Sequence, residues 1–439
     1  MIRRRAGLSF NLSSDFFYKG SVRTLKVIDE GFLPSEFVCV PLDDIFGLYG
    51  KLRPKYPGLV VALQGAVPAY TAADGDVVRF PNGMGYPNES ELKARIPAIT
   101  DDEIATLRHL ATLEGLEVEI ADDDDKGLCI VACPRPLPDD FAPAVILDGS
   151  ARVRHAYKVL EKSRPDFMRL PPCVHDYANL EINLWKRSAG KKALDNAAYR
   201  EETIRCISEI INADEDQWLI INRKDNAAKY GYLLRSEIED QVLNPHRLEF
   251  THWGKHKATN EFAHIKKVMV IGGYTYTHGT YRALYRACTG VMGGHIDKTQ
   301  LAQIRQGEHM DHYLQGICRS YVRNADPITG ICGVAQVYIV APINQASKAS
   351  MEEMFPGAVV KHWSPVTKAL KGQAARLVEE VLCRLPAGSH GIAPKSEVLS
   401  AIGSKGTMSN LLRIPGVRER LKAEGIDIET YRFVRITPS

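Results

Sequence analysis

The sequence has no long hydrophobic run. Its longest apolar stretch, residues 58–69, is interrupted by Gln64 and Pro68 and is far shorter than the roughly 20 residues that a helix needs to cross a bilayer. Residues 1–10 contain a basic cluster with no apolar segment behind it, so they do not match a secretory signal peptide. We therefore expect a protein with no membrane partner.

The sequence also lacks cysteines at the spacing of metal or redox motifs. The 9 cysteines are dispersed, and the closest pair, Cys129 and Cys133, does not form a C-x-x-C motif. A scattered, odd set of thiols is typical of a reducing compartment and predicts a cytoplasmic protein. The acidic run at 122–125 is followed by Lys126 and then Gly127. This glycine does not fit the frame of a calcium loop, so we expect a solvated loop there.

Charge of neither sign dominates the chain. Its 439 residues include 56 Lys and Arg against 53 Asp and Glu, and 45% of the residues are hydrophobic. This composition excludes disordered, collagen-like and coiled-coil classes, and the length suits two to four domains of about 150 residues. A near-neutral total neither requires nor excludes a nucleic-acid partner, because a local basic groove can be balanced by acids elsewhere.

Apolar runs that alternate with helical patterns indicate a doubly wound α/β domain at residues 144–365. Because the expected strands are apolar throughout, they predict a parallel sheet covered on both faces. The expected strands are 144–147, 218–221, 248–250, 268–271 and 335–340, and the expected helices are 153–162, 196–211, 281–287 and 310–323.

The regions on either side of this domain have different sequence patterns. Residues 33–143 contain recurrent prolines and a helical pattern at 101–113 behind the N-cap Thr100, which indicates an inserted α+β subdomain. Residues 371–439 combine short helical segments with a closing strand, which favours a small winged-helix module with a basic side. A helical cap packed on the sheet domain is an equal alternative. Residues 1–32 form a separate N-terminal segment that contains one strand-like run.

Two acids end the first strand-like run. Residues 22–28 are followed by Asp29 and Glu30. In nucleotide-hydrolysing α/β proteins, an Asp at such a strand end positions Mg²⁺ through its water shell, and the adjacent Glu polarises the attacking water. Acids that only keep a strand end soluble are the alternative.

A second candidate group lies in the helical run 310–323. Gln315, Arg319 and Arg323 are spaced four residues apart, so a continuous helix would place them on one face. Guanidinium groups on such a face can bind phosphate oxygens in a bidentate manner. A solvated basic stripe is the alternative.

A third candidate group is the loop that follows the strand at 248–250. A glycine allows close approach of the backbone to a ligand, lysines supply positive charge, and short polar side chains can contact a nucleic-acid backbone. The candidate nucleic-acid-binding residues are Gly254, Lys255, Lys257, Thr259 and Asn260.

Taken in order, these segments resemble the motor of superfamily 2 helicases. The insertion at 33–143 is similar to the DinG-type layout, in which an arch domain occupies that place. Asp29-Glu30 resembles the DExx motif, residues 147–151 resemble the S/D-A-T motif, residues 218–224 resemble the strand that opens the second RecA-like lobe, Gly254 with Thr259-Asn260 resembles the G-x-N motif, and residues 315–323 resemble the Q-x-x-G-R-x-x-R helix with its arginine finger.

The resemblance implies a RecA-like fold, in which residues 1–32 end the first lobe and residues 144–365 form the second. It also implies ATP and Mg²⁺ as cofactors, and DNA or RNA as the partner. Asp29 would hold Mg²⁺ through water, and Glu30, Gln315, Arg319 and Arg323 would complete the catalytic set. Two details depart from the family: Cys318 replaces a glycine, and Arg323 comes one residue late.

The chain also contains no G-x-x-x-x-G-K-[ST] phosphate loop. We therefore expect ATP hydrolysis only when an upstream-encoded chain supplies that loop. The alternative is a non-enzymatic nucleic-acid-binding accessory protein of replication or of a mobile element. It would use the C-terminal module and the loop with Lys255 and Lys257.

Overall fold

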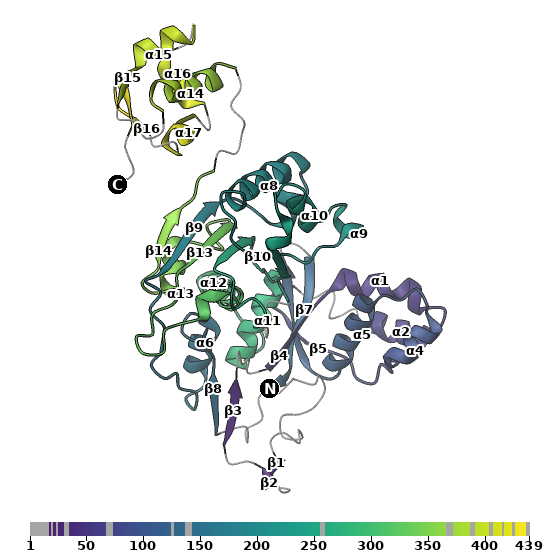
Figure 1. The fold of residues 1–439 in the computed structure, drawn as a ribbon. Helices are drawn as coiled ribbons and strands as arrows, with labels where there is room; N and C mark the ends of the chain where they lie inside the picture. Colours follow the sequence, from purple (N-terminus) through teal and green to yellow (C-terminus); the bar gives the residue numbers. More distant parts are fainter. Residues whose placement is uncertain are drawn as a thin grey trace. The chain divides into compact units, whose positions relative to one another are not determined.

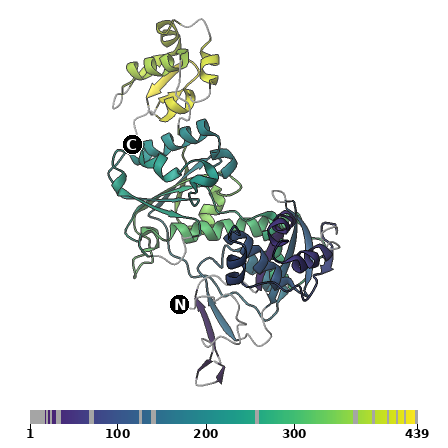
Figure 2. The same cartoon turned by 90° about the vertical axis from the view of Figure 1, so that its right-hand side faces the viewer.

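The chain divides into two compact units in the computed structural model. Unit 1 comprises residues 1–174 and 274–315, and unit 2 comprises residues 175–273 and 316–439. Figures 1 and 2 show the elements of both. The structure describes residues 17–18, 21–22, 25–29, 35–66, 73–123, 127–136, 143–254, 260–365, 372–386, 391–403, 407–414, 417–423 and 426–435.

The inserted part of unit 1 is built on an antiparallel sheet. Its strands are β4 (Ser35–Pro41), β5 (Val77–Arg79), β6 (Glu117–Asp123) and β7 (Gly127–Pro136), in the order β4-β7-β6-β5. The two sides of the sheet differ because side chains alternate along each strand. One side contributes Val38, Val40, Ile120 and Ile130 to the main core of this part.

Among the described residues, helices accompany this sheet (Figure 1): α1 (Leu42–Leu52), α2 (Pro57–Gly65), α4 (Glu89–Arg95) and α5 (Asp101–Leu113). The helix predicted at 101–113 is confirmed. The Thr100 side chain accepts a hydrogen bond from the backbone of Glu103, whose side chain accepts one from the backbone of Thr100. This reciprocal cap satisfies two amides that the first turn leaves unpaired.

The other side of the same sheet is covered by a helix from much later in the sequence. Helix α11 (His278–Thr289) packs on β4, β7 and β6, and Ala283 joins Ala121, Cys129 and Val131 in a small core. It also packs on α6 (His155–Ser163), with α12 (Lys298–Ile317) contributing Ile304 to the shared core. The connection between two neighbouring strands of unit 2 thus supplies unit 1 with the helices at 274–315.

The remaining described strands of unit 1 form two small sheets. Strands β1 (Phe17–Tyr18) and β2 (Ser21–Val22) form an antiparallel pair, and β3 (Lys26–Asp29) pairs in parallel with β8 (Ala144–Leu147). The strand predicted at 144–147 therefore exists. Our expectation that it would open the large parallel sheet is wrong, because its partner is β3.

Unit 2 contains a parallel sheet of six strands, which confirms the predicted α/β class and the parallel sheet. The order is β11-β10-β12-β13-β9-β14, and all neighbouring pairs are parallel. Every residue of β10 is buried, as expected for a strand covered on both faces. The strands are β9 (Leu180–Lys186), β10 (Trp218–Asn222), β11 (Leu248–His252), β12 (Lys267–Ile271), β13 (Ala335–Ala341) and β14 (Val359–His362).

Short helices connect these strands. They are α7 (Lys191–Leu194), α8 (Ala197–Ile211), α9 (Ala227–Tyr230), α10 (Leu234–Glu239), α13 (Lys348–Met354), and the 3₁₀ turns η4 (Pro245–Arg247) and η5 (Tyr321–Arg323). The predicted helix at 196–211 is confirmed as α8, and Asn196 is its N-cap. No helix among the residues that the structure describes has the length and apolar character required to span a bilayer.

The C-terminal residues form a module with a core of their own, centred on buried Leu377, Leu421 and Phe433. Its strands are arranged antiparallel in the order β15-β17-β16. The elements are α14 (Gly372–Arg384), β15 (Ile392–Pro394), α15 (Lys395–Ala401), α16 (Met408–Arg413), α17 (Val417–Ala423), β16 (Ile426–Ile428) and β17 (Arg432–Arg435). The structure therefore contains both the short helical segments and the closing strand that the sequence predicted for residues 371–439.

Candidate functional site

The parallel pair β3 and β8 brings two of the sequence motifs to one edge in unit 1. Asp29, the last residue of β3, lies opposite Leu147, the last residue of β8. The DExx-like and S/D-A-T-like segments are therefore neighbours, and both strands run towards the same edge. Glu30 and the Asp29 side chain lie outside what the structure describes.

The carboxylate of Asp148 is fixed directly beyond this edge. Its Oδ1 accepts hydrogen bonds from the backbone N of Ser150 at 2.8 Å and from the Ser150 hydroxyl at 2.6 Å. Its Oδ2 accepts one from the Tyr157 hydroxyl at 2.7 Å. Ser150 is fully buried, whereas Asp148 is half-buried. Three donors thus hold one carboxylate at the end of a parallel strand.

A buried ion pair lies next to this network. Arg154 Nε and Nη2 donate to the two carboxylate oxygens of Glu308 at 2.6 and 2.8 Å, and the side chains are only 6% and 2% exposed. The Arg154 guanidinium also lies 5.8 Å from the ring centre of Tyr157. Burial alone would lower the pKa of Arg154, but Glu308 raises it well above its usual value. Arg154 is therefore charged, and it links the residues after β8 to helix α12.

Helix α12 presents further buried polar groups that the sequence reasoning did not single out. Glu308, Asp311 and His312 each offer a ligand atom, and these atoms lie within 4.8 Å of one another. Their spacing of i, i+3 and i+4 puts them on one helix face. This spacing is the sequence pattern that could have identified them. The His312 ring packs edge-on against Tyr274, with ring centres 4.7 Å apart. Because Arg154 already engages both Glu308 oxygens, this face is better suited to positioning α12 than to binding a cation.

In unit 2, the helix expected at 310–323 ends early. Helix α12 begins at Lys298 and ends at Ile317, so Arg319 lies in the following turn and Arg323 in η5. The Ser320 hydroxyl stops the helix because it donates to the Ile317 carbonyl at 2.7 Å and accepts from the amide of Val322. The prediction that Gln315, Arg319 and Arg323 share one helix face is therefore wrong.

The turn after α12 nevertheless brings two predicted site residues together. The Tyr321 amide donates to the Ile265 carbonyl at 2.9 Å. This hydrogen bond holds the turn against the segment that precedes β12. There Arg323 Nη1 donates to Asn260 Oδ1, and both side chains are exposed. Arg319 is instead buried at 9% exposure.

The other candidate residues are placed as follows. Gln315 is half-buried in the last turn of α12. Gly254 is exposed two residues after the end of β11, with a φ of 100° that only glycine adopts readily. The neighbouring Trp253 is buried, and its amide donates to the Asn222 carbonyl at 2.9 Å. Lys255, Lys257 and Thr259 lie outside the described residues.

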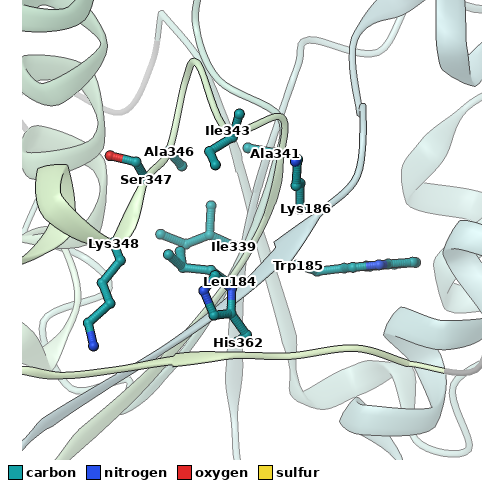
Figure 3. Close-up of a pocket in the computed structure, with 10 residues that line it drawn as sticks. All are labelled: Leu184, Trp185, Lys186, Ile339, Ala341, Ile343, Ala346, Ser347, Lys348 and His362. Atoms are coloured by element: carbon teal, nitrogen blue, oxygen red, sulfur yellow. The ribbon is translucent and has the colours of Figure 1, made fainter. Parts of the chain in front are cut away.

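The carboxyl ends of β13, β9 and β14 border a shallow hollow in unit 2. Figure 3 shows Ser347 and Lys348 on one side of it and Lys186 on the other, with Ile339 and Leu184 between them. Its lining has no acidic side chain. The lining residues are Leu184, Trp185, Lys186, Ile339, Ala341, Ile343, Ala346, Ser347, Lys348 and His362. An apolar floor with cations around it suits an anionic ligand, and the carboxyl edge of such a sheet is where α/β folds bind ligands.

No model of a protein family matches the chain, and no curated protein matches its sequence.

Proposed function

We propose that this chain is the nucleic-acid-binding motor portion of a superfamily 2, DinG-like helicase. In this proposal the six-stranded sheet is a RecA-like lobe, and β3 with β8 belongs to the preceding lobe. Asp29 positions Mg²⁺ and Glu30 activates water, while Arg319 and Arg323 contact the γ-phosphate of ATP together with Gln315. The segment with Gly254, Lys255, Lys257, Thr259 and Asn260 contacts DNA or RNA.

The pairing of β3 with β8 is the observation that carries the proposal. The two segments are far apart in the sequence, with the whole insertion between them, yet Asp29 lies opposite Leu147 in a parallel pair. A motor that couples hydrolysis to movement needs its metal acid and its coupling motif at one strand edge. The link from Asp148 through Tyr157, and from Arg154 to Glu308 on α12, offers a physical route for that coupling.

The bond between Arg323 and Asn260 is a second, independent support. It joins the segment assigned to nucleic acid with the segment assigned to the phosphate. Arg323 can exchange Asn260 for a γ-phosphate, since guanidinium binds phosphate oxygens more strongly than a neutral amide.

The residues present fit part of the ATP–Mg²⁺ site. A carboxylate-bearing edge of a parallel pair suits Mg²⁺, which prefers a few carboxylates together with water and phosphate. The 439 residues contain no phosphate loop, so in this proposal a segment outside them cradles the triphosphate. We therefore propose an upstream-encoded chain that carries this loop as a partner.

One observation favours the rival function, a non-enzymatic nucleic-acid-binding accessory protein. The C-terminal module has its own core and exposes Arg413, Arg418 and Arg420. A compact module with exposed arginines is sufficient to bind a phosphate backbone without any nucleotide.

Nucleotide and DNA binding by the same variants distinguish the two functions. We expect the chain, combined with the upstream product, to bind a fluorescent ATP analogue, and we expect Glu30→Gln with Arg319→Ala to abolish that binding while DNA binding is retained. Arg95→Ala, an exposed arginine of the insertion, is the matched control. If the parent binds DNA but no nucleotide under any of these conditions, the accessory function is correct.

A further inference from the structure

Three side chains of the inserted sheet converge from three neighbouring strands of unit 1. Cys39 belongs to β4, Cys129 to β7 and Asp123 to β6, and one ligand atom of each lies within 4.8 Å of the others. The register explains this convergence, because Cys129 lies opposite Pro41 on one side and Ala121 on the other. Cys39 and Asp123 are each two residues from those positions, so alternation puts all three side chains on one face.

The first turn of α11 closes over this group. The amide of Gly279 donates to Asp123 Oδ2 at 2.8 Å. A Cβ atom at position 279 would stand 2.5 Å from the Cys129 sulfur and 2.7 Å from the Cys39 sulfur. Only glycine therefore lets the helix begin this close to the two thiols.

Second partners orient the three ligands. The Cys129 thiol lies 3.2 Å from the Ala121 carbonyl, and the hydroxyls of Thr277 and Thr280 hydrogen-bond with Cys39. Cys129 is fully buried and Asp123 is 2% exposed, whereas Cys39 is half-buried. Hydrogen bonds of this kind commonly hold the ligands of a metal in place.

The local charges also permit a cation. Arg282, one turn further along α11, is neutralised by Glu119 at 2.7 Å and by Asp74 at 2.7 Å. The buried carboxylate of Asp123, by contrast, adds negative charge directly beside the two sulfurs.

We propose that Cys39, Cys129 and Asp123 bind a divalent cation of the zinc class. Two thiolates and one carboxylate are ligands that zinc accepts, with sulfur about 2.3 Å and oxygen about 2.1 Å from the metal, and the observed separations allow one ion to reach all three. The two thiol protons pass to solvent on binding, and the fourth position takes a water. The ion ties β4, β6 and β7 together beneath α11 and so stabilises the seam between the insertion and residues 274–315. This inference does not depend on the proposed motor function.

Cobalt(II) is the probe, because it occupies zinc sites and reports thiolate ligands by a near-ultraviolet charge-transfer band. We expect the reduced, metal-free full-length chain to bind one Co²⁺ with this band and with the visible bands of a four-coordinate ion. Cys39→Ser and Cys129→Ser should each weaken the charge-transfer band by about half or more, and Asp123→Asn should weaken Co²⁺ affinity about tenfold or more. Cys206→Ser, a buried thiol of α8 in unit 2, is the matched control and should leave both unchanged.

Two further results bear on the proposal if the serine variants fold poorly. Zinc should raise the melting temperature of the parent but not that of Asp123→Asn, with circular dichroism confirming that this variant is folded. The proposal is overturned if the reduced parent shows no charge-transfer band with equimolar Co²⁺, or if the band persists in both serine variants. It is equally overturned if Cys39 and Cys129 are recovered as a disulfide and the reduced pair binds no Co²⁺, because the two thiols would then be a redox pair.

Discussion

The buried carboxylate of Glu119 offers the sharpest stability prediction. Glu119 has no exposed surface and accepts hydrogen bonds from Arg282 Nε at 2.7 Å, from Arg286 Nε at 2.5 Å and from Arg286 Nη2 at 2.9 Å. Arg282 and Arg286 come from α11, whereas Glu119 comes from β6. The cluster therefore fastens the sheet to the helix that covers it.

Glu119→Gln keeps the shape of the side chain but removes its charge. Arg282 and Arg286, which are 9% and 3% exposed, would then lose their buried counter-charge. Arg282 would keep Asp74, which is 53% exposed in that ion pair, and Arg286 would keep the Gly294 carbonyl. Removing one partner from a buried ionic group costs about 3–5 kcal/mol. For a unit of this size that corresponds to about 6–20 °C in melting temperature, since each kcal/mol shifts it by about 2–4 °C.

The distribution of tryptophan allows the two units to be followed separately. Trp185, Trp218, Trp253 and Trp363, the 4 tryptophans of the sequence, all belong to unit 2. Glu119→Gln should therefore lower the far-ultraviolet circular-dichroism transition of unit 1 and leave the tryptophan-fluorescence transition in place.

Glu117→Gln, an exposed residue at the start of the same strand, is the matched control and should change stability by about 0.5 kcal/mol or less. Equal shifts of the melting temperature in both variants would contradict the assigned role of Glu119. A shift of the fluorescence transition alone would contradict it as well.

Two further predictions concern packing and pH. Gly307→Ala should destabilise unit 1 by about 1–3 kcal/mol, because its Cβ would stand 2.4 Å from the backbone N of His155. Gly47→Ala in α1, where a Cβ meets nothing within 4 Å, should instead stabilise by up to about 1 kcal/mol; circular-dichroism melting compares the two, and the same sign for both would be inconsistent with the packing described. In unit 2, burial opposes ionisation of Asp214, but hydrogen bonds from Lys267, the Asp216 amide and Trp218 outweigh it and lower its pKa. The folded pKa of Asp214 lies below the usual value of about 3.9. The ionised carboxylate therefore adds to the free energy of unfolding above pH 3.9, and this stabilisation is lost as the pH falls through the folded pKa. Fluorescence-monitored urea unfolding between pH 6 and 3 should therefore show a steeper loss of the free energy of unfolding for the parent than for Asp214→Asn. Parallel pH profiles of the two proteins would refute this role of Asp214.

Much of the fold could be predicted because its signals are local. The apolar strand at 218–222 and the capped helix at 101–113 each depend on residues within one element. The early end of α12 was missed because Ser320 stops the helix through its own hydrogen bonds, while the apolar pattern continues beyond it. The edge strand β14 and its neighbour β9 were missed as well, although β9 is almost entirely buried.

The candidate sites depend on contacts between distant segments, which a single sequence does not show. Asp123 was expected in a solvated acidic loop, but that prediction is wrong because Gly279 of α11 covers its carboxylate. The same long-range packing hides the role of Cys39, whose spacing from Cys129 matches no linear motif. The contact between Asn260 and Arg323 likewise required the chain to turn after α12.

ATP turnover is the most direct test of the proposed motor. The chain should hydrolyse no ATP by itself, and should gain DNA-stimulated hydrolysis when the proposed partner supplies a phosphate loop. Glu30→Gln should abolish that gained activity without weakening DNA binding. Robust hydrolysis by the chain alone would contradict the split site, and a complete mixture that binds DNA but never turns over ATP would contradict the motor itself.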